Sequence, residues 1–306
     1  MAIDVYSRED LETLGMSDRA VARAVAAGRA VRLRPGRFVN AAEWRALHVE
    51  AQQRVRAEAA RQAAERPPVF ALATAAAVHG LPLFRVVDDR VHVLSRTERA
   101  APANRLVVRH EDAYTDDELI EVDGLVVTRL DRTVFDLIRL LPAEAGVALA
   151  DAALRAAADG EALRAAVAER IARAPGARGI RRARAVLAFA DERSESPGES
   201  ASRWFLRVLG FRTIEIQVGF PGPDGREIRI DFRFRRGWGE FDGAAKYTEP
   251  AYLRGRPPQQ VLLDEKRRED WVRGRSQEPF VRWMDRDMPT PRALGAHLAG
   301  FGIVPD

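Results

Sequence analysis

The sequence predicts an α+β protein built from several domains, and three observations lead to this fold class. Residues 4–40 show two capped helical patterns followed by a short hairpin. Residues 143–192 are almost entirely helical in pattern. Residues 228–242 show the period-two alternation of half-buried strands, with helical patterns before and after them. A helix, a mixed sheet and later helices together indicate an α/β layer arrangement in the C-terminal part of the chain.

The composition limits the class of protein. With 306 residues the chain has room for two or three domains, and 46% hydrophobic and 31% charged residues are typical of globular proteins. The chain contains no cysteine, which excludes disulfides and cysteine-ligated zinc and favours a reducing cytoplasm. Neither a signal peptide nor an uncharged stretch of membrane-spanning length is visible. We therefore expect a cytoplasmic protein with no membrane partner.

The N-terminal residues have the outline of a winged helix. Ser7 and Asp10 form a capping box that predicts a short helix, and Ser17 caps a second helix. Residues 30–40, AVRLRPGRFVN, then read as two strands around a Pro-Gly turn. Helix, turn, helix and hairpin together predict a winged-helix DNA-binding domain over residues 1–43.

Five arginines of this domain are candidate DNA contacts. Arg19 and Arg23 lie one helical turn apart on the second helix, and Arg32, Arg34 and Arg37 follow the hairpin. The alternative is that these side chains only solvate a small surface. That alternative stays open, because 47 of the 49 basic residues of the chain are arginine.

Residues 44–157 predict an α+β middle domain. A single helix is expected over residues 44–66, ended by Pro67-Pro68, and a small-residue helix follows in ALATAAAVHG. Three strands are expected in VHVLSR, RLVVRHE and GLVVTRL, and the last leads into the helix RTVFDLIRLL.

Histidines and one aspartate of the middle domain invite functional interpretations that the spacing does not support. His79 has no second histidine or carboxylate beside it at metal-ligand spacing, so we expect a helix-end histidine bonded to a carbonyl. His92 and His110 fall on predicted strands and are interpreted as structural. Asp131 is interpreted as the cap of the helix that follows it.

Residues 158–196 predict a helical connector. It carries a basic cluster, of which Arg181 and Arg182 are the candidate DNA contacts. A charge run on a helix is usually a solvated face. A phosphate-backbone contact is the alternative, because the cluster directly precedes the C-terminal domain.

The C-terminal region contains the candidate catalytic residues. Asp231 alternates with apolar neighbours on one strand, and Glu240 and Asp242 flank an aromatic residue and so share one face of the next strand. If the strands pair, three carboxylates gather at one point, where Mg²⁺ or Mn²⁺ would relieve their repulsion. Lys246 follows closely and could orient a water or stabilise phosphate charge. The alternative is an ordinary acidic strand edge.

This pattern resembles the PD-(D/E)xK nuclease core, and more narrowly the very-short-patch-repair-like endonuclease domain of many actinobacterial proteins. The resemblance rests on Asp231, the hairpin, the FDGAAKY run, and Glu199 in PGESASRWFLRVLGF, with DEKRREDWVRG and FVRWMDRDM downstream. It implies a restriction-endonuclease-like α/β domain over residues 197–306. It also implies phosphodiester hydrolysis by a metal-activated water.

The resemblance also assigns roles to individual residues. Asp231 and Glu240 would hold Mg²⁺, with Glu199 and Asp242 in or next to its coordination shell. The Glu-x-Lys of the family stands here as Glu-x-Asp, so the catalytic lysine must be Lys246 or Lys266, the two lysines of the chain. Lys246 is the expected choice, because Lys266 lies among charged neighbours that offer it local ion pairs.

A second resemblance concerns the front of the chain. EDLETLGMSDRAVARAVAAGRAVRLRPGRFV resembles the N-terminal domain of AbiEi-type antitoxins, and AAVHGLP and VTRLDRTVFDLIR resemble their middle region. It implies a winged helix that binds operator DNA.

The sequence therefore leaves two functions open. The first is a DNA-binding protein with a metal-dependent nuclease domain. The second is a non-enzymatic repressor or antitoxin of a type IV toxin–antitoxin system, with a degenerate nuclease fold and a nucleotidyltransferase-like toxin as partner. An RNA-directed nuclease is disfavoured, because no aromatic-rich base-stacking surface is visible. The oligomeric state is not predicted, since no dimer seam is visible.

Overall fold

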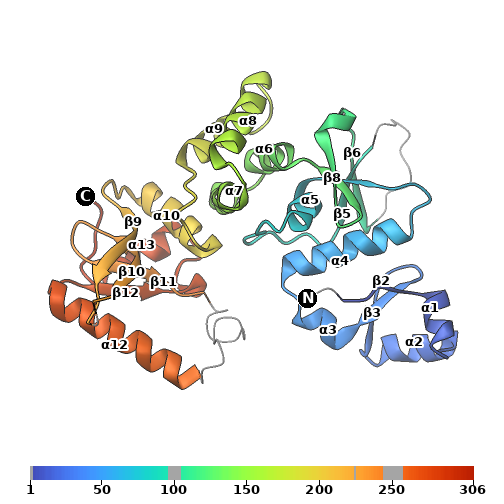
Figure 1. Cartoon of the computed structure of the whole chain (residues 1–306), viewed down its shortest axis with the longest axis horizontal. Coiled ribbons are helices and arrows are strands. Elements are labelled where there is room, and N and C mark those ends of the chain that lie inside the picture. The colour runs from blue at the N-terminus through green and yellow to red at the C-terminus, as the bar shows by residue number, and fades with distance from the viewer. Residues whose placement is uncertain (1–2, 96–104, 224, 244–257) are drawn as a thin grey trace. The chain divides into compact units, whose positions relative to one another are not determined.

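The computed structural model describes residues 3–95, 105–223, 225–243 and 258–306, and it has a mixed α/β fold with three sheets (Figure 1). This confirms the α+β fold class. The chain divides into two compact units: Met1–Leu141 with Glu161–Arg184, and Pro142–Gly160 with Ala185–Asp306. The finer domain boundaries at residues 43, 157 and 196 stay predictions.

The N-terminal sheet has three strands in the order β1-β3-β2, with α1 and α2 packed beside it. The predicted capping box is confirmed: the Asp10 N–H donates to Ser7 Oγ, and the Ser7 N–H donates to the Asp10 carboxylate. Ser17 caps α2 as predicted. The predicted hairpin is also confirmed, and a short strand that the sequence did not reveal, β1, pairs with it. The elements are β1 Tyr6–Ser7, α1 Arg8–Thr13, α2 Asp18–Ala26, β2 Ala30–Arg34 and β3 Arg37–Asn40.

The single helix expected over residues 44–66 is wrong. Two helices occupy this stretch, α3 (Ala41–Ala46) and α4 (Val49–Gln62). Asn40 accepts hydrogen bonds from the Ala42 and Glu43 N–H groups and so starts α3 early, whereas His48 caps the start of α4. The break allows Trp44 of α3 and Val55 of α4 to pack into one hydrophobic cluster.

The middle sheet has five strands in the order β6-β5-β4-β8-β7. Three strands were predicted, and the other two have a weak local signal because β4 has only two residues and the two middle residues of β7 are exposed. Phe70 of β4 is nevertheless central: it is fully buried and pairs with Val93 on one side and Val127 on the other. The elements are β4 Val69–Phe70, α5 Leu72–Val78, β5 Val91–Leu94, β6 Val107–His110, β7 Leu119–Val122, β8 Leu125–Thr128 and α6 Leu130–Leu140.

His79 lies at a helix end as predicted, whereas Asp131 is not the helix cap that was predicted. His79 follows the last residue of α5, and its Nε2 lies 2.8 Å from the Thr128 carbonyl oxygen, which confirms the helix-end interpretation. Asp131 does not cap α6, because the N-cap residue is Arg129. Its carboxylate instead accepts a hydrogen bond from Arg170 Nε at 2.5 Å. Arg170 is 39 positions away along the chain, which local spacing cannot reveal.

His92 and His110 contact each other across neighbouring strands. His92 Nδ1 lies 2.9 Å from His110 Nε2, and His92 Nε2 lies 3.2 Å from the Asp88 carboxylate. Burial lowers the pKa of both imidazoles, so their neutral forms are favoured.

The predicted helical stretch is present as α7 (Ala143–Ala156), α8 (Gly160–Arg173) and α9 (Ile180–Phe189). Within the second unit, α7 packs against α10 (Pro197–Leu209) through a buried ion pair. Arg203 Nη2 donates to the Asp151 carboxylate at 2.8 Å, and Asp151 has no solvent exposure. Arg203 Nη1 also donates to the Phe189 carbonyl oxygen.

The C-terminal sheet has the order β12-β11-β10-β9, with β9, β10 and β11 antiparallel and β12 parallel to β11. On one face, Trp238 and Phe280 pack against Val272 of α12. On the other, Trp283 Nε1 donates to Ser202 Oγ of α10 at 2.8 Å. Helices thus cover both faces, α12 on one side and α10 with α13 on the other (Figure 1). The elements are β9 Glu215–Pro221, β10 Glu227–Arg233, β11 Trp238–Phe241, α12 Pro258–Ser276, β12 Phe280–Trp283 and α13 Pro291–Ala299.

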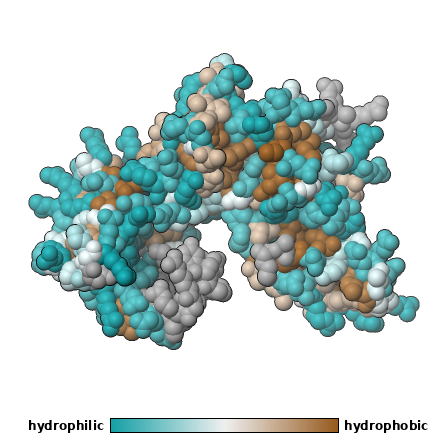
Figure 2. Space-filling view, viewed as in Figure 1, coloured by the Kyte–Doolittle hydropathy of each residue, from teal (hydrophilic) through white to brown (hydrophobic). Residues whose placement is uncertain are grey.

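None of the helices that the structure describes combines the length and apolar composition that crossing a membrane requires. Hydrophilic side chains cover most of the face drawn in Figure 2.

Replacing Arg203 by Met should lower the free energy of unfolding by about 3–5 kcal/mol, because the buried Asp151 carboxylate loses its cation. Urea denaturation measures this change. Arg207→Met, at an exposed position of the same helix, is the control and should change stability by less than about 0.5 kcal/mol. The double variant Asp151→Leu/Arg203→Met should recover much of the loss. A single Arg203→Met variant as stable as the control would contradict the role of this pair.

Candidate active site

Asp231 lies where strands β10 and β11 separate. The two strands pair at Arg233 with Trp238 and at Phe232 with Gly239. Beyond these pairs, the Phe241 N–H donates to the Asp231 carboxylate at 2.9 Å. The Asp231 side chain is therefore bound to the residue that stands between Glu240 and Asp242.

Helix α10 brings Glu199 to the same end of the sheet. Ser196 caps the helix and accepts a hydrogen bond from the Glu199 N–H. The first turn can approach β11 because residue 198 is glycine: a Cβ there would lie 2.0 Å from the Phe241 ring. Glu199 is 7% exposed, and its carboxylate accepts a hydrogen bond from the Glu195 N–H at 2.9 Å.

Gln217 of β9 connects Glu199 to Asp231. Its Nε2 donates to the Glu199 carboxylate at 2.8 Å and lies 3.5 Å from Asp231 Oδ1. The Gln217 backbone has a φ of 55°, a left-handed conformation that strains a residue other than glycine. The sequence interpretation missed Gln217, although a polar residue inside the apolar strand TIEIQVGF is a visible signal.

Glu240 and Asp242 are both buried, with 2% and 5% exposure. Glu240 lies in β11 and Asp242 directly follows this strand; both side chains approach Arg282 of the neighbouring strand, so they share one face, as their spacing predicts. Arg282 donates to Asp242 from Nε at 2.6 Å and from Nη2 at 2.7 Å, and its Nε lies 3.9 Å from Glu240 Oε2. Glu240 also receives Nη2 of Arg268, from α12, on both carboxylate oxygens.

Arg282 is held by acids of α12 as well. Its Nη2 donates to Glu265 at 3.0 Å, and its Nη1 lies 3.9 Å from Glu269. Burial by itself would lower the pKa of Arg282, but the hydrogen bonds and negative charge of Asp242, Glu265 and Glu240 outweigh it and raise the pKa. This guanidinium is therefore a fixed positive charge. The sequence interpretation missed both arginines; an arginine between the buried residues Val281 and Trp283 is a signal for Arg282.

The acids thus form two connected pairs, Glu199 with Asp231 through Gln217, and Glu240 with Asp242 through Arg282. Within the described ranges, no three or more His, Cys, Asp or Glu side chains are grouped so that they could hold a metal ion. Carboxylate oxygens are the ligands that Mg²⁺ and Mn²⁺ prefer, but here the acids are held as two separate pairs. In this structure arginine guanidinium groups supply positive charge to Glu240 and Asp242.

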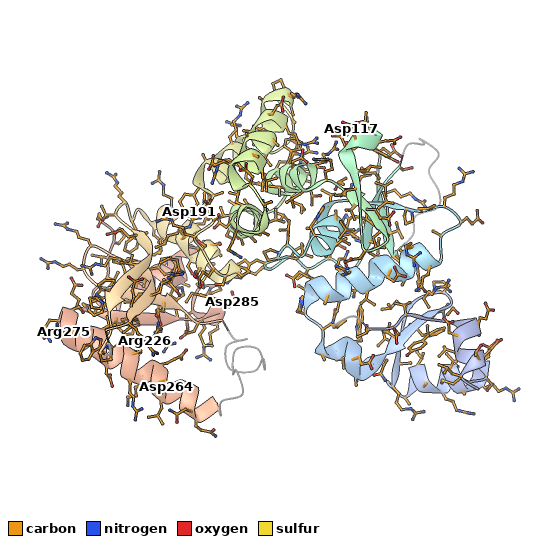
Figure 3. The ribbon with its side chains drawn as sticks, in the orientation of Figure 1. Asp117, Asp191, Arg226, Asp264, Arg275 and Asp285 are labelled. Atoms are coloured by element: carbon orange, nitrogen blue, oxygen red, sulfur yellow. The ribbon has the colours of Figure 1, made fainter. Side chains whose placement is uncertain are left out.

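Only one of the two lysines lies within the described residues. Lys246 lies outside the described residues. Lys266 is exposed on α12. Figure 3 labels Asp264 and Arg275 toward the two ends of this helix, and Glu265, Arg268 and Glu269 lie between them in the sequence.

Burial shifts the pKa of the Glu199 carboxyl. It raises the pKa above the ordinary value of 4.5, and the nearby charge of Glu195 acts in the same direction. Hydrogen bonds from Glu195, Ser196 and Gln217 act in the opposite direction. A carboxyl with a raised pKa that lies beside other acids is a candidate proton carrier.

The candidate DNA contacts in the N-terminal region fall into two groups. Arg19, Arg23 and Arg32 are exposed on α2 and β2. Arg34 is half-buried, and burial, followed by the charge of Arg37, lowers its pKa. Arg37 is bound within the fold, because its Nη2 donates to the Gln62 carbonyl oxygen at 2.6 Å.

Both candidate DNA contacts of α9, Arg181 and Arg182, are exposed. Arg182 Nη1 donates to the carbonyl oxygens of Leu140 and Leu141 at 3.2 and 2.8 Å, so its guanidinium caps the C-terminal end of α6.

The fold and this site together define a mixed α/β protein with a buried acidic cluster at one end of its C-terminal sheet. No protein-family model matches the chain. Two uncharacterized proteins of Mycobacterium tuberculosis, MT2308 from strain CDC 1551 and Rv2248 from strain H37Rv, are each 31% identical to it over 199 residues. The matched stretch covers 65% of this chain and 68% of each relative. The chain belongs to the same family as these mycobacterial proteins.

Replacing Glu199 by Gln should stabilise the protein at high pH. Because the folded-state pKa is raised, the stabilising contribution of the protonated carboxyl is complete below the unfolded pKa of about 4.5 and is lost as pH rises through the folded pKa. A neutral amide does not undergo this loss. We expect Glu199→Gln to raise the Tm at pH 8 by about 2–4 °C, and the difference should disappear near pH 4.5.

Thermal unfolding between pH 4.5 and 8 tests this expectation. Glu215→Gln, at an exposed position on β9, is the matched control and should show no such pH-dependent difference. A Glu199→Gln variant that is less stable than the wild type at pH 8 would show that the ionised carboxylate is favoured by the fold.

Proposed function

We propose that this chain is a DNA-binding protein whose C-terminal, restriction-endonuclease-like domain hydrolyses phosphodiester bonds with Mg²⁺ or Mn²⁺. One observation carries the proposal. Glu199 of α10 and Asp231 of β10 are linked through Gln217, and Asp231 also accepts the N–H of Phe241, the residue between Glu240 and Asp242. An ordinary acidic edge would be solvated, whereas Glu199, Glu240 and Asp242 are buried.

In this proposal Asp231, Glu240 and Asp242 hold the cation. The bound ion would lower the pKa of a water molecule and offset the charge of the phosphate. Glu199 would hold or release a proton beside this water, since its pKa is raised by burial. Lys246 is assigned to orient the water or to offset phosphate charge.

The N-terminal region is assigned as a winged helix that binds DNA in the cytoplasm. Its order of two short capped helices and a hairpin supports this assignment. Arg19, Arg23 and Arg32 are exposed on neighbouring elements and supply the phosphate contacts. Arg34 contributes from the hairpin to a smaller extent, because it is half-buried.

A specific observation favours a second candidate function. Glu240 and Asp242 each receive two hydrogen bonds from an arginine, as a carboxylate does in a purely structural ion pair. A chain in which these pairs are permanent would bind DNA without cleaving it. It would then act as a repressor or antitoxin of the type IV kind, with a nucleotidyltransferase-like toxin as its partner.

A cleavage assay separates the two functions. Supercoiled plasmid and single-stranded DNA are incubated with the full chain and Mg²⁺, Mn²⁺ or a chelator. We expect cleavage that depends on the metal, and Asp231→Ala should reduce its rate by about 10²-fold or more, because a ligand of the cation is lost. Asp270→Ala, at an exposed position on α12, is the control and should cleave normally. DNA binding without cleavage in both metals would select the regulatory function.

Replacing Arg23 by Ala should weaken DNA binding in a salt-dependent way. Loss of one phosphate contact lowers the slope of log affinity against log salt concentration by about one. Fluorescence anisotropy at several salt concentrations measures this slope. Arg61→Ala is the matched control, because Arg61 is exposed on α4 but bound to Glu58. An unchanged slope for Arg23→Ala would remove α2 from the DNA interface.

A further inference from the structure

A cavity of about 330 Å³ lies beside the turn that joins β10 to β11, and the acids of the candidate active site do not line it. Its floor consists of three buried apolar side chains, Phe211, Phe234 and Ile303. Its rim consists of exposed residues of the segment 302–306 and of the two arginines at the tip of the turn. Small-molecule sites typically have volumes of about 300–1,000 Å³. The cavity therefore has room for one small ligand.

The turn holds the backbone of these two arginines, Arg235 and Arg236, beside the cavity. A hydrogen bond from the Phe234 N–H to the Gly237 carbonyl oxygen, 3.0 Å long, closes the turn. Gly237 has a φ of 119°, and a Cβ at this residue would lie 3.0 Å from the Ile303 side chain. Only glycine combines this backbone conformation with such close packing. The two arginines therefore extend from a fixed base.

Specific contacts also hold the segment 302–306 that forms the other part of the rim. The Asp306 carboxylate accepts hydrogen bonds from the Arg212 N–H at 3.1 Å and from the Thr213 N–H at 2.8 Å. It also accepts from the Thr213 hydroxyl. Ile303 is 2% exposed and packs into the fold. The cavity is therefore formed before any ligand arrives.

The charges of Arg235 and Arg236 are not matched within the fold. The neighbouring Arg233 donates to Glu278 at 3.1 Å. Arg235 and Arg236, in contrast, have neither a hydrogen bond nor an ion pair with any residue that the structure describes. Asp306 belongs to the same lining, but it pairs with neither arginine and instead accepts the donors of residues 212–213. Two adjacent positive charges thus lie at the rim of an apolar cavity.

This lining suits a ligand that combines a flat ring with a doubly charged anion. Guanidinium groups match the geometry of phosphate oxygens. A phosphate monoester carries a charge of about −1.5 to −2 at pH 7, so it matches two arginines better than a singly charged carboxylate does. The rings of Phe211 and Phe234, with centroids 5.5 Å apart, offer an aromatic surface on which a nucleobase can pack. A nucleoside 5′-phosphate contains both parts.

We propose that this cavity binds a nucleoside 5′-monophosphate group, with the phosphate on Arg235 and Arg236 and the base over the apolar floor. This binding site goes beyond the proposed function, because it needs neither a metal ion nor cleavage of DNA. The same chemical group occurs in a free nucleotide and at the 5′-phosphorylated end of a DNA strand.

Isothermal titration calorimetry of the full chain tests the site, with thymidine 5′-monophosphate as the probe and a chelator present. We expect the nucleotide to bind more tightly than inorganic phosphate or thymidine, because each of these supplies only one part of the ligand. Arg235→Gln and Arg236→Gln should each weaken nucleotide binding about fivefold, because a charge-assisted contact is lost. The Tm should not change, since both residues are exposed.

Two further variants separate local from general charge effects. Val304→Asp adds a negative charge to the rim at a residue that is 61% exposed, and it should also weaken nucleotide binding. Arg267→Gln is the matched control, because it removes a positive charge from α12 at a side chain that is 72% exposed. Its affinity for the nucleotide should stay within about twofold of the wild type, since solvent screens an exposed charge.

Fluorescence anisotropy distinguishes the two sources of the ligand. A short single-stranded DNA with a 5′-phosphate is compared with the same strand that carries a 5′-hydroxyl. Tighter binding of the phosphorylated strand, lost in Arg236→Gln, would assign the site to a DNA end. Binding of the free nucleotide together with equal affinities for the two strands would assign it to a free nucleotide.

Three results would overturn the proposal. The first is that the protein recognises neither the nucleotide at millimolar concentration nor the 5′-phosphate of the strand. The second is that inorganic phosphate binds as tightly as the nucleotide. The third is that Arg235→Gln and Arg236→Gln both bind like the wild type. None of these results bears on metal-dependent cleavage, which the plasmid assay tests separately.

Discussion

The burial of carboxylates beneath α12 is the constraint on which the C-terminal fold depends. Glu240 and Asp242 lie on a sheet face that a helix covers, so each must meet a cation inside the protein. The parallel pairing of β11 with β12 places Arg282 directly opposite Glu240, and α12 supplies Arg268. Docking of α12 therefore satisfies charges as well as covering Trp238 and Phe280. A sheet of the same topology with apolar residues at these positions would not need this helix to carry arginine.

The opposite face of the same sheet shows how close packing positions a functional group. Gly198 allows α10 to approach the Phe241 ring, and Ser202 accepts the hydrogen bond of the Trp283 indole. These two contacts fix the first turns of the helix over β11 and β12. Glu199 then reaches Gln217, whose strained backbone lies next to Asp231. Rigid packing on one face and ion pairing on the other thus meet at the end of the acidic hairpin.

Arginine side chains bind groups that are distant in the sequence at several places in the described fold. In the first unit, Arg170 donates to Asp131 and Glu118 at 2.5 and 2.6 Å. Arg37 and Arg182 donate to backbone carbonyl oxygens. The planar guanidinium suits such contacts because it presents several donors in a fixed geometry. The number of arginines in a segment is therefore a poor measure of its attraction for DNA, because hydrogen bonds within the fold hold some of them, as in Arg37 and Arg182.

The sequence by itself determined the features whose causes lie within a few residues. These are the capping box of Ser7 and Asp10, the hairpin of residues 30–40, and the order of helices and strands in the C-terminal sheet. Only the tertiary structure decided where helix 44–66 breaks, that the two-residue strand β4 is central, and which partner each charge takes. Arg268 and Arg282 stand 28 and 40 positions from the acids they bind. Periodicity and caps act through neighbouring residues, whereas the partner of a buried charge is whichever group the folded chain brings within hydrogen-bonding distance.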